Sequence, residues 1–166
     1  MVTLLMSSEM GEYLVGAYLK LIEECEIVTY NQRVDKQREI DVIGFDFSNN
    51  EIFLCEVATH LEGLSYGGKN KDTVNHVRKK LIAIKEYADR SFPSMKKRMM
   101  FWSPYVPEGY ITEEFRKMND ELDTSFIINT KYTEKVKALM RKAAKETKDR
   151  GEPFYRALQI LEHLRK

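Results

Sequence analysis

Residues 38–60 are REIDVIGFDFSNNEIFLCEVATH, and this stretch decides the fold class. Two runs rich in Ile, Val and Phe flank Ser48-Asn49-Asn50, and Asn tolerates the positive φ that tight hairpin turns require. We therefore predict two antiparallel strands over 38–47 and 51–58. The same enrichment in β-branched and aromatic residues predicts further strands over 27–34, 97–102 and 124–129.

Apolar side chains at helical spacing predict helices around these strands. Ser7 or Ser8 is the expected N-cap of the first helix, and Thr112 that of the third. The order α-β-β-β-α-β-α-β-α-α indicates an α/β fold, a mixed sheet with helices on both faces. With 166 residues and no repeat, we expect one domain with a core over 8–129 and C-terminal helices over 130–166. The predicted helices cover 7–26, 72–90, 112–122, 131–149 and 153–165.

The composition excludes several classes of protein. There are 27 basic and 26 acidic residues, so no overall positive charge announces a nucleic-acid binder, although a local basic face stays open. Cys25 and Cys55 lie in apolar segments and are expected to be buried, because two such cysteines make neither a disulfide framework nor a zinc site. No signal peptide and no apolar run of about 20 residues is visible, which predicts a cytoplasmic protein without a membrane partner.

The hairpin carries two acidic residues, Asp41 and Glu56. If the turn is the two residues Asn49-Asn50, Asp41 faces Ala58 and Ile43 faces Glu56, so the two acids are diagonal neighbours on one face. An odd number of turn residues would put them on opposite faces.

Both faces of these strands are otherwise apolar, so a carboxylate there is costly unless it is paired or binds metal. Asp41 and Glu56 could therefore hold one divalent cation. The alternative is a structural salt bridge to Arg33, Arg38 or a lysine. By strict alternation, one face holds Ile40, Val42, Phe53, Cys55 and Val57, and the other holds Ile43, Phe45, Ile52 and Leu54 beside the two acids.

Further polar residues flank the hairpin in sequence. Glu12 shares a helical row with Val15 and Leu19, so it is either a third acid of the site or a favourable charge in a first helical turn. His60 could transfer a proton or contact a metal, or simply end the strand. A basic cluster that could hold phosphates, or could be a solvated surface, contains Lys69, Lys71, Arg78, Lys79 and Lys80, with Tyr66 and His76 interleaved.

At this point residues 8–103 resemble the PD-(D/E)XK nuclease superfamily. The resemblance rests on the α-β-β-β-α-β order and on EIDVIG (39–44) and CEVATH (55–60). It implies a restriction-endonuclease-like fold in which Asp41 is the first strand acid, Glu56 is the (D/E) of the motif, and Glu12 is the acid of the first helix. The motif lysine should follow at position 58, which is alanine here.

The missing lysine leaves two hypotheses. A lysine could have migrated to Lys69, Lys71, Lys79 or Lys80, with Thr59 a weak substitute because alternation turns it to the opposite face. Alternatively, the fold has lost cleavage and serves as a module that binds nucleic acid or protein. A third interpretation is a plain salt bridge, with a basic residue in contact with both acids and no metal.

The leading expectation is a Mg²⁺- or Mn²⁺-dependent DNA endonuclease. We expect Asp41, Glu56 and the Val57 carbonyl to bind the metal, and Lys79 to act in catalysis together with Asp41, Glu56 and Glu12. DNA would contact Lys69, Lys71, Arg78 and Lys80, with His60 in an accessory role. The resemblance also leaves a homodimer open, since many nucleases of this fold dimerise to cut both strands. The apolar residues of the last helix could form core or an interface, and we assign them to the core; they are Phe154, Leu158, Leu161 and Leu164.

Overall fold

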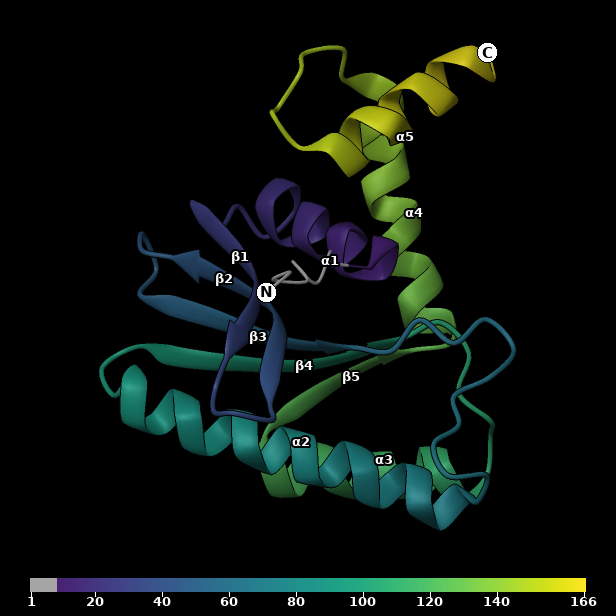
Figure 1. The fold of residues 1–166 in the computed structure, drawn as a ribbon. Helices are drawn as coiled ribbons and strands as arrows, with labels where there is room; N and C mark the ends of the chain where they lie inside the picture. Colours follow the sequence, from purple (N-terminus) through teal and green to yellow (C-terminus); the bar gives the residue numbers. More distant parts are fainter. Residues whose placement is uncertain (1–8) are drawn as a thin grey trace, which may run out of the picture.

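The computed structural model describes residues 9–166, and its elements follow the predicted order (Figure 1). The predicted caps Ser7 and Ser8 lie outside the described residues, and the first helix has Glu9 as its N-cap. Within residues 9–166, no helix is long and apolar enough to span a bilayer. The elements are α1 Met10–Leu21, β1 Ile27–Arg33, β2 Glu39–Asp46, β3 Glu51–Val57, α2 Asn70–Ser91, β4 Lys96–Ser103, α3 Tyr110–Leu122, β5 Thr124–Ile128, α4 Thr130–Lys145 and α5 Pro153–Leu164.

The strands form one mixed sheet in the order β1-β2-β3-β4-β5. The first three strands pair antiparallel, because short turns connect them, whereas β3, β4 and β5 pair parallel through the crossover helices α2 and α3. α2 and α3 cover one face of the sheet, and α1 and α4 cover the other (Figure 1). The predicted α/β class, with helices on both faces of a mixed sheet, is confirmed.

The β2–β3 turn contains four residues, 47–50, and not the predicted two. Val42 lies opposite Cys55 and Ile43 opposite Leu54, so the predicted pairing of Ile43 with Glu56 and of Asp41 with Ala58 is wrong. The turn still has an even number of residues, as the prediction that the two acids lie together requires, and the Asp41 and Glu56 side chains do interact directly.

The side chain of Asp46 explains why the turn is longer. Its Oδ1 accepts the Asn49 backbone N–H at 2.9 Å, and its Oδ2 accepts the Asn49 side-chain amide at 2.7 Å. Asn50 supplies the one positive φ, 53°, which Asn tolerates better than most residues. The Asp46 carboxylate therefore makes the turn begin at residue 47, two residues before the predicted Asn49-Asn50 turn.

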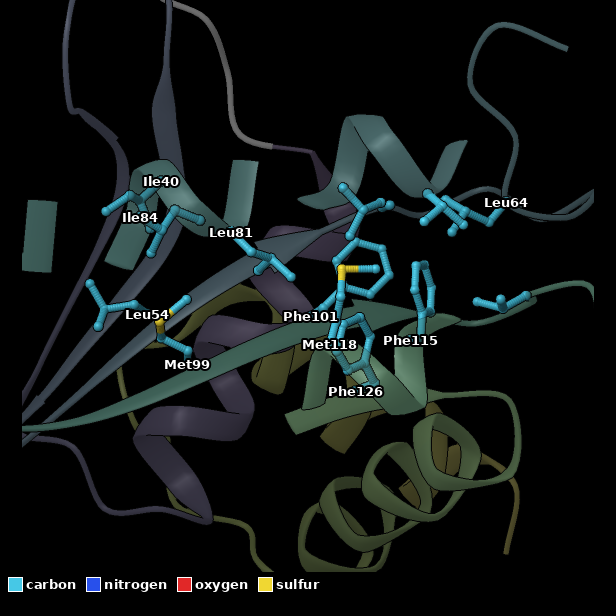
Figure 2. Close-up of a cluster of buried hydrophobic side chains, with 14 of the residues drawn as sticks. Ile40, Leu54, Leu64, Leu81, Ile84, Met99, Phe101, Phe115, Met118 and Phe126 are labelled. Carbon is cyan, nitrogen blue, oxygen red and sulfur yellow. The ribbon is translucent and has the colours of Figure 1, made fainter. Parts of the chain in front are cut away.

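The core on the α2 side of the sheet is rich in aromatic and branched side chains (Figure 2). Leu54, Leu81 and Phe101 are fully buried at its centre. Ile40 belongs to this cluster and lies beside Ile84 in Figure 2, so the prediction that it shares a face with Val42 is wrong. The β2–β3 ladder ends at Val42, and strict alternation across the sheet is not preserved beyond that pair.

The core on the α1 side surrounds Trp102, whose ring packs edge-on against Tyr18. Cys25 and Cys55 are free and buried there, as predicted. Burial in this cluster raises the pKa of the Cys25 thiol to about 12, because a thiolate is poorly solvated among apolar side chains. Both cysteines are therefore core residues and poor nucleophiles.

Two local predictions are corrected at helix ends and surfaces. Thr112 is not the N-cap of α3: Gly109 is, and the Thr112 hydroxyl accepts the Gly109 N–H at 3.1 Å from the first turn. On α5, Leu161 and Leu164 are exposed and do not join the core. Phe154 and Leu158 do pack, partly buried, against the core cluster that contains Tyr155. The most buried residues of α5 are Tyr155, Gln159 and Glu162, and Tyr155 and Gln159 also hydrogen-bond to the segment that follows α4. The homodimer stays a prediction.

Gly16 lets α1 lie directly on the ring of Tyr30. A Cβ at position 16 would lie 2.0 Å from the Tyr30 hydroxyl and 2.6 Å from its Cζ. We expect Gly16→Ala to lower the free energy of unfolding by about 1–2 kcal/mol, because overpacking outweighs the gain in helix propensity. Urea denaturation measures this. In a Tyr30→Ala background the same change should be neutral or stabilising, and an equal loss in both backgrounds would contradict the proposed contact.

Candidate functional site

A polar cavity of about 380 Å³ lies where α1, the ends of β2 and β3, and α2 meet. Its walls come from segments far apart in the sequence. Because β2 and β3 stop pairing at Val42 and Cys55, the next residue on each strand, Asp41 and Glu56, lies at this edge. The cavity is lined by Glu9, Glu12, Asp41, Val57, Ala58, Thr59, His60, Tyr66 and Lys80.

The Asp41 side chain replaces a backbone hydrogen-bond acceptor between β2 and β3. Its Oδ2 accepts the Val57 backbone N–H at 2.7 Å, a bond that replaces the next rung of the β2–β3 ladder. This bond fixes the carboxylate between the strand ends. Burial nevertheless raises the pKa of Asp41, although the Val57 N–H and the positive charge of Lys80 both oppose that rise.

Glu56 is buried more deeply and forms an ion pair with Lys80 of α2. The Lys80 ammonium donates to Glu56 Oε1. Glu56 Oε2 is buried and no donor among residues 9–166 reaches it, while the Asp41 carboxylate lies close enough to share a proton with Glu56. An oxygen in that state is costly, so a proton or a cation next to it would stabilise the folded protein.

The charges of this trio are strongly coupled. Burial, followed by the negative charge of Asp41, raises the pKa of Glu56 to about 8, despite the nearby Lys80 ammonium. Burial disfavours the charge on Lys80, but the Glu56 carboxylate outweighs this effect and raises the pKa of Lys80. At neutral pH the site thus holds two acids, of which one tends to keep its proton, beside a charged lysine.

Lys80 contacts Glu56, whereas position 58, where the resemblance would place a lysine, is alanine. Ala58 is 3% exposed and packs in the core on the α2 side of the sheet. Lys80 approaches Glu56 from α2, on that same side. Lys79 is exposed and does not line the cavity, so the lysine that sequence reasoning selected for catalysis lies outside the site.

The helical pattern of α2 already distinguishes the two lysines. Thr73, Val77 and Ile84 are buried on the inner face of the helix, and Lys80 falls in the same row of positions, four residues before Ile84 and three after Val77. Lys79 is rotated by one residue, roughly 100° around the helix. Counting that row would have identified Lys80 in advance.

Glu12 reaches the cavity because α1 lies unusually close to the end of β3. A Cβ on Gly11 would lie 1.8 Å from the Thr59 hydroxyl, so only glycine allows this approach. Thr59 lines the cavity with its hydroxyl against Gly11 of α1. Ala58 packs on the α2 side, so Thr59 points to the opposite face, as alternation predicts. Over residues 9–166, however, no three His, Cys, Asp or Glu side chains are grouped closely enough to hold a metal.

An aromatic group forms the mouth of the cavity. The Tyr66 ring stacks on His76 with centroids 4.0 Å apart and contacts His60 at 5.0 Å. Thr73 accepts the Tyr66 backbone N–H at 2.8 Å, which ties this loop to the start of α2. Burial and then the charges of Lys80 and Lys79 lower the pKa of His76. In the sequence, Tyr66 stands out only as an aromatic residue next to the basic cluster.

The other predicted nucleic-acid contacts lie outside the cavity. Lys69 and Lys71 are exposed at the start of α2. Arg78 is engaged by Glu121 of α3. Of the four predicted contacts, Lys80 is the one that the structure brings to the acids.

The geometry suits chemistry on an anionic group that enters the cavity. Two buried carboxylates attract a cation, and an ammonium beside them can stabilise negative charge. Comparison with known proteins adds no independent assignment: no family model matches the chain, and no curated protein matches it.

Proposed function

We propose that this protein is a Mg²⁺-dependent nuclease that hydrolyses phosphodiester bonds in DNA. One observation carries the proposal: Lys80 of α2 lines the same cavity as Asp41 of β2 and contacts the buried carboxylate of Glu56 on β3. The resemblance of residues 39–44 and 55–60 to PD-(D/E)XK nucleases supports it, and so does the order of elements. On this proposal the fold is restriction-endonuclease-like, with Lys80 in place of the motif lysine.

The donor set fits Mg²⁺ better than a metal that needs a full protein cage. Mg²⁺ typically takes one or two carboxylates, keeps several waters and binds substrate phosphate oxygens. Asp41, the unpartnered Glu56 Oε2 and the Val57 carbonyl would supply the protein oxygens. When bound, the ion would polarise the phosphate and lower the pKa of a coordinated water. Mn²⁺ would fit the same donors.

The residues of the chain would divide the remaining work. Asp41, held by the Val57 N–H, keeps a fixed carboxylate at the strand ends. Lys80 would exchange its contact with Glu56 for the phosphate oxygens and stabilise the charge that develops during hydrolysis. Glu12 and His60 line the same cavity and are placed to orient a water or to accept a proton.

A second function is favoured by the same ion pair. Lys80 pairs directly with Glu56, as expected if the site has lost cleavage and only stabilises the fold. A protein of this kind would bind nucleic acid or protein without hydrolysis. Buried ion pairs are weak evidence for stability, and the unpartnered Glu56 Oε2 favours the nuclease over this alternative.

Lys80→Gln compared with Lys79→Gln tests the proposal directly. We expect Lys80→Gln to lower the rate of Mg²⁺-dependent cleavage by about 10²- to 10³-fold, the range seen when one group that stabilises transition-state charge is removed. Lys79→Gln, which makes the same chemical change on the neighbouring exposed residue, should change it less than about threefold. Cleavage of linear, circular, branched and single-stranded DNA, with EDTA as the blank, gives the rates.

Circular dichroism and urea denaturation show whether both variants fold. No cleavage by the wild-type protein on any of these substrates would support the binding module. Equal rates for the two variants would reject Lys80 as the catalytic lysine.

A further inference from the structure

A second cavity, of about 270 Å³, lies beside the acid site and beneath the β1–β2 hairpin. It shares Lys80 with the acid cavity. Four of its side chains are cationic and two are acidic, so its lining is positive overall. The acid cavity is instead lined by Glu9, Glu12 and Asp41 beside Lys80. Its lining residues are Arg33, Asp35, Lys36, Gln37, Arg38, Glu39 and Lys80.

The hairpin that forms this cavity has a defined conformation. Asp35 Oδ1 accepts the backbone N–H groups of Gln37 and Arg38 at 2.8 and 2.9 Å. The other oxygen, Oδ2, accepts the Arg38 guanidinium at 2.7 Å. Asp35 therefore closes the turn and takes up the charge of Arg38, which leaves Arg33 and Lys36 without an ion-pair partner in the part of the chain that the structure describes.

The two cavities are also adjacent along β2. Glu39 lines the basic cavity and Asp41 lines the acid cavity. These residues are two positions apart, about 7 Å along a strand. One nucleotide of sugar-phosphate backbone spans a distance of that order.

We propose that the basic cavity binds a phosphate of the nucleic-acid strand next to the phosphate that enters the acid cavity. Arg33 and Lys36 would supply the new contacts, and Lys80 would stand between the two phosphates. The inference rests on the proposed function for the identity of the strand. The charges favour an anion: Arg33 and Lys36 have no ion-pair partner among residues 9–166, and both side chains attract phosphate oxygens.

The test measures binding apart from cleavage. Fluorescence anisotropy follows the binding of labelled single-stranded and duplex DNA to the wild-type protein and to Arg33→Gln/Lys36→Gln, in EDTA, over a range of salt concentrations. Arg38 and Asp35 are kept, because their pair shapes the turn. We expect the double variant to bind at least about tenfold more weakly, with a salt slope lower by about one to two phosphate contacts.

Arg90→Gln and Arg90→Gln/Lys85→Gln are the matched controls. Arg90 is exposed at the far end of α2, about 15 Å along the helix from Lys80. The double control removes the same charge as the hairpin variant and should leave affinity and salt slope within about twofold of wild type, because non-local charge is screened.

The outcomes separate this inference from the proposed function. DNA binding that the hairpin substitutions weaken, in a protein that does not cleave, supports the subsite and contradicts the nuclease. Cleavage with DNA affinity and salt slope unchanged by the hairpin substitutions overturns the subsite alone. Equal weakening by the hairpin and Arg90 variants would show general electrostatic attraction, and would also overturn it. Absence of any DNA binding overturns both.

Discussion

Asp41→Asn and Glu56→Gln are each expected to abolish metal-dependent cleavage while the protein stays folded. Each substitution keeps the shape of the side chain and removes a charge that the proposed cation needs. Metal-ion catalysis contributes several kcal/mol of transition-state stabilisation, which corresponds to a loss of about a thousandfold or more. The same variants should lose Mg²⁺ binding by calorimetry, a measurement that does not depend on activity.

Glu51→Gln is the matched control for Glu56→Gln. Glu51 lies on the same strand, at its opposite end, and its carboxylate pairs with the exposed side chains of Lys96 and Arg98. We expect wild-type cleavage and Mg²⁺ binding in this variant. Mg²⁺ binding that persists in Asp41→Asn and Glu56→Gln would place the metal elsewhere, and normal cleavage in either would remove that residue from the mechanism.

The second large effect is on stability as the pH rises. In the unfolded chain Glu56 ionises near its ordinary pKa of 4.5, whereas in the fold its pKa is about 8. Between these values the folded state binds more protons than the unfolded state, so stability falls as the pH increases through this window. Glutamine does not ionise, and Glu56→Gln should therefore gain stability relative to wild type between pH 5 and pH 9.

The expected gain is on the order of 4 kcal/mol, because one pKa unit corresponds to about 1.4 kcal/mol and the pKa of about 8 already includes the opposing effect of Lys80. Urea denaturation of Glu56→Gln and of wild type in EDTA, at pH 5 and at pH 9, measures this gain. The difference in the free energy of unfolding between Glu51→Gln and wild type should be the same at both pH values. The Lys96 contact lowers the pKa of Glu51, so this group is ionised throughout the range. A constant difference for Glu56→Gln as well would show that Glu56 is not buried as described.

Adding Mg²⁺ provides a second test of this prediction. A ligand that binds only the folded protein stabilises it by mass action. At pH 9, Mg²⁺ should therefore raise the stability of the wild-type protein but not of Glu56→Gln. Equal stabilisation of both by Mg²⁺ would indicate a site that does not involve Glu56.

The sequence by itself determined the order of the elements and the pairing of the two acids on one face. Both follow from local chemistry: apolar periodicity separates helices from strands, and any even turn keeps Asp41 and Glu56 together. The inward row of α2 also contained the signal for Lys80, because Val77 and Ile84 lie on that row. These features depend on neighbours in the chain, which a sequence shows directly.

The tertiary structure alone decided which groups meet at the site. The hairpin register depended on the Asp46 side chain, which closes a four-residue turn. Thr59 faces the cavity because α1 lies against it at Gly11, and the basic cavity exists because α2 brings Lys80 beneath the β1–β2 turn. Each contact joins residues brought together by the packing of separate elements, and no local pattern encodes that packing.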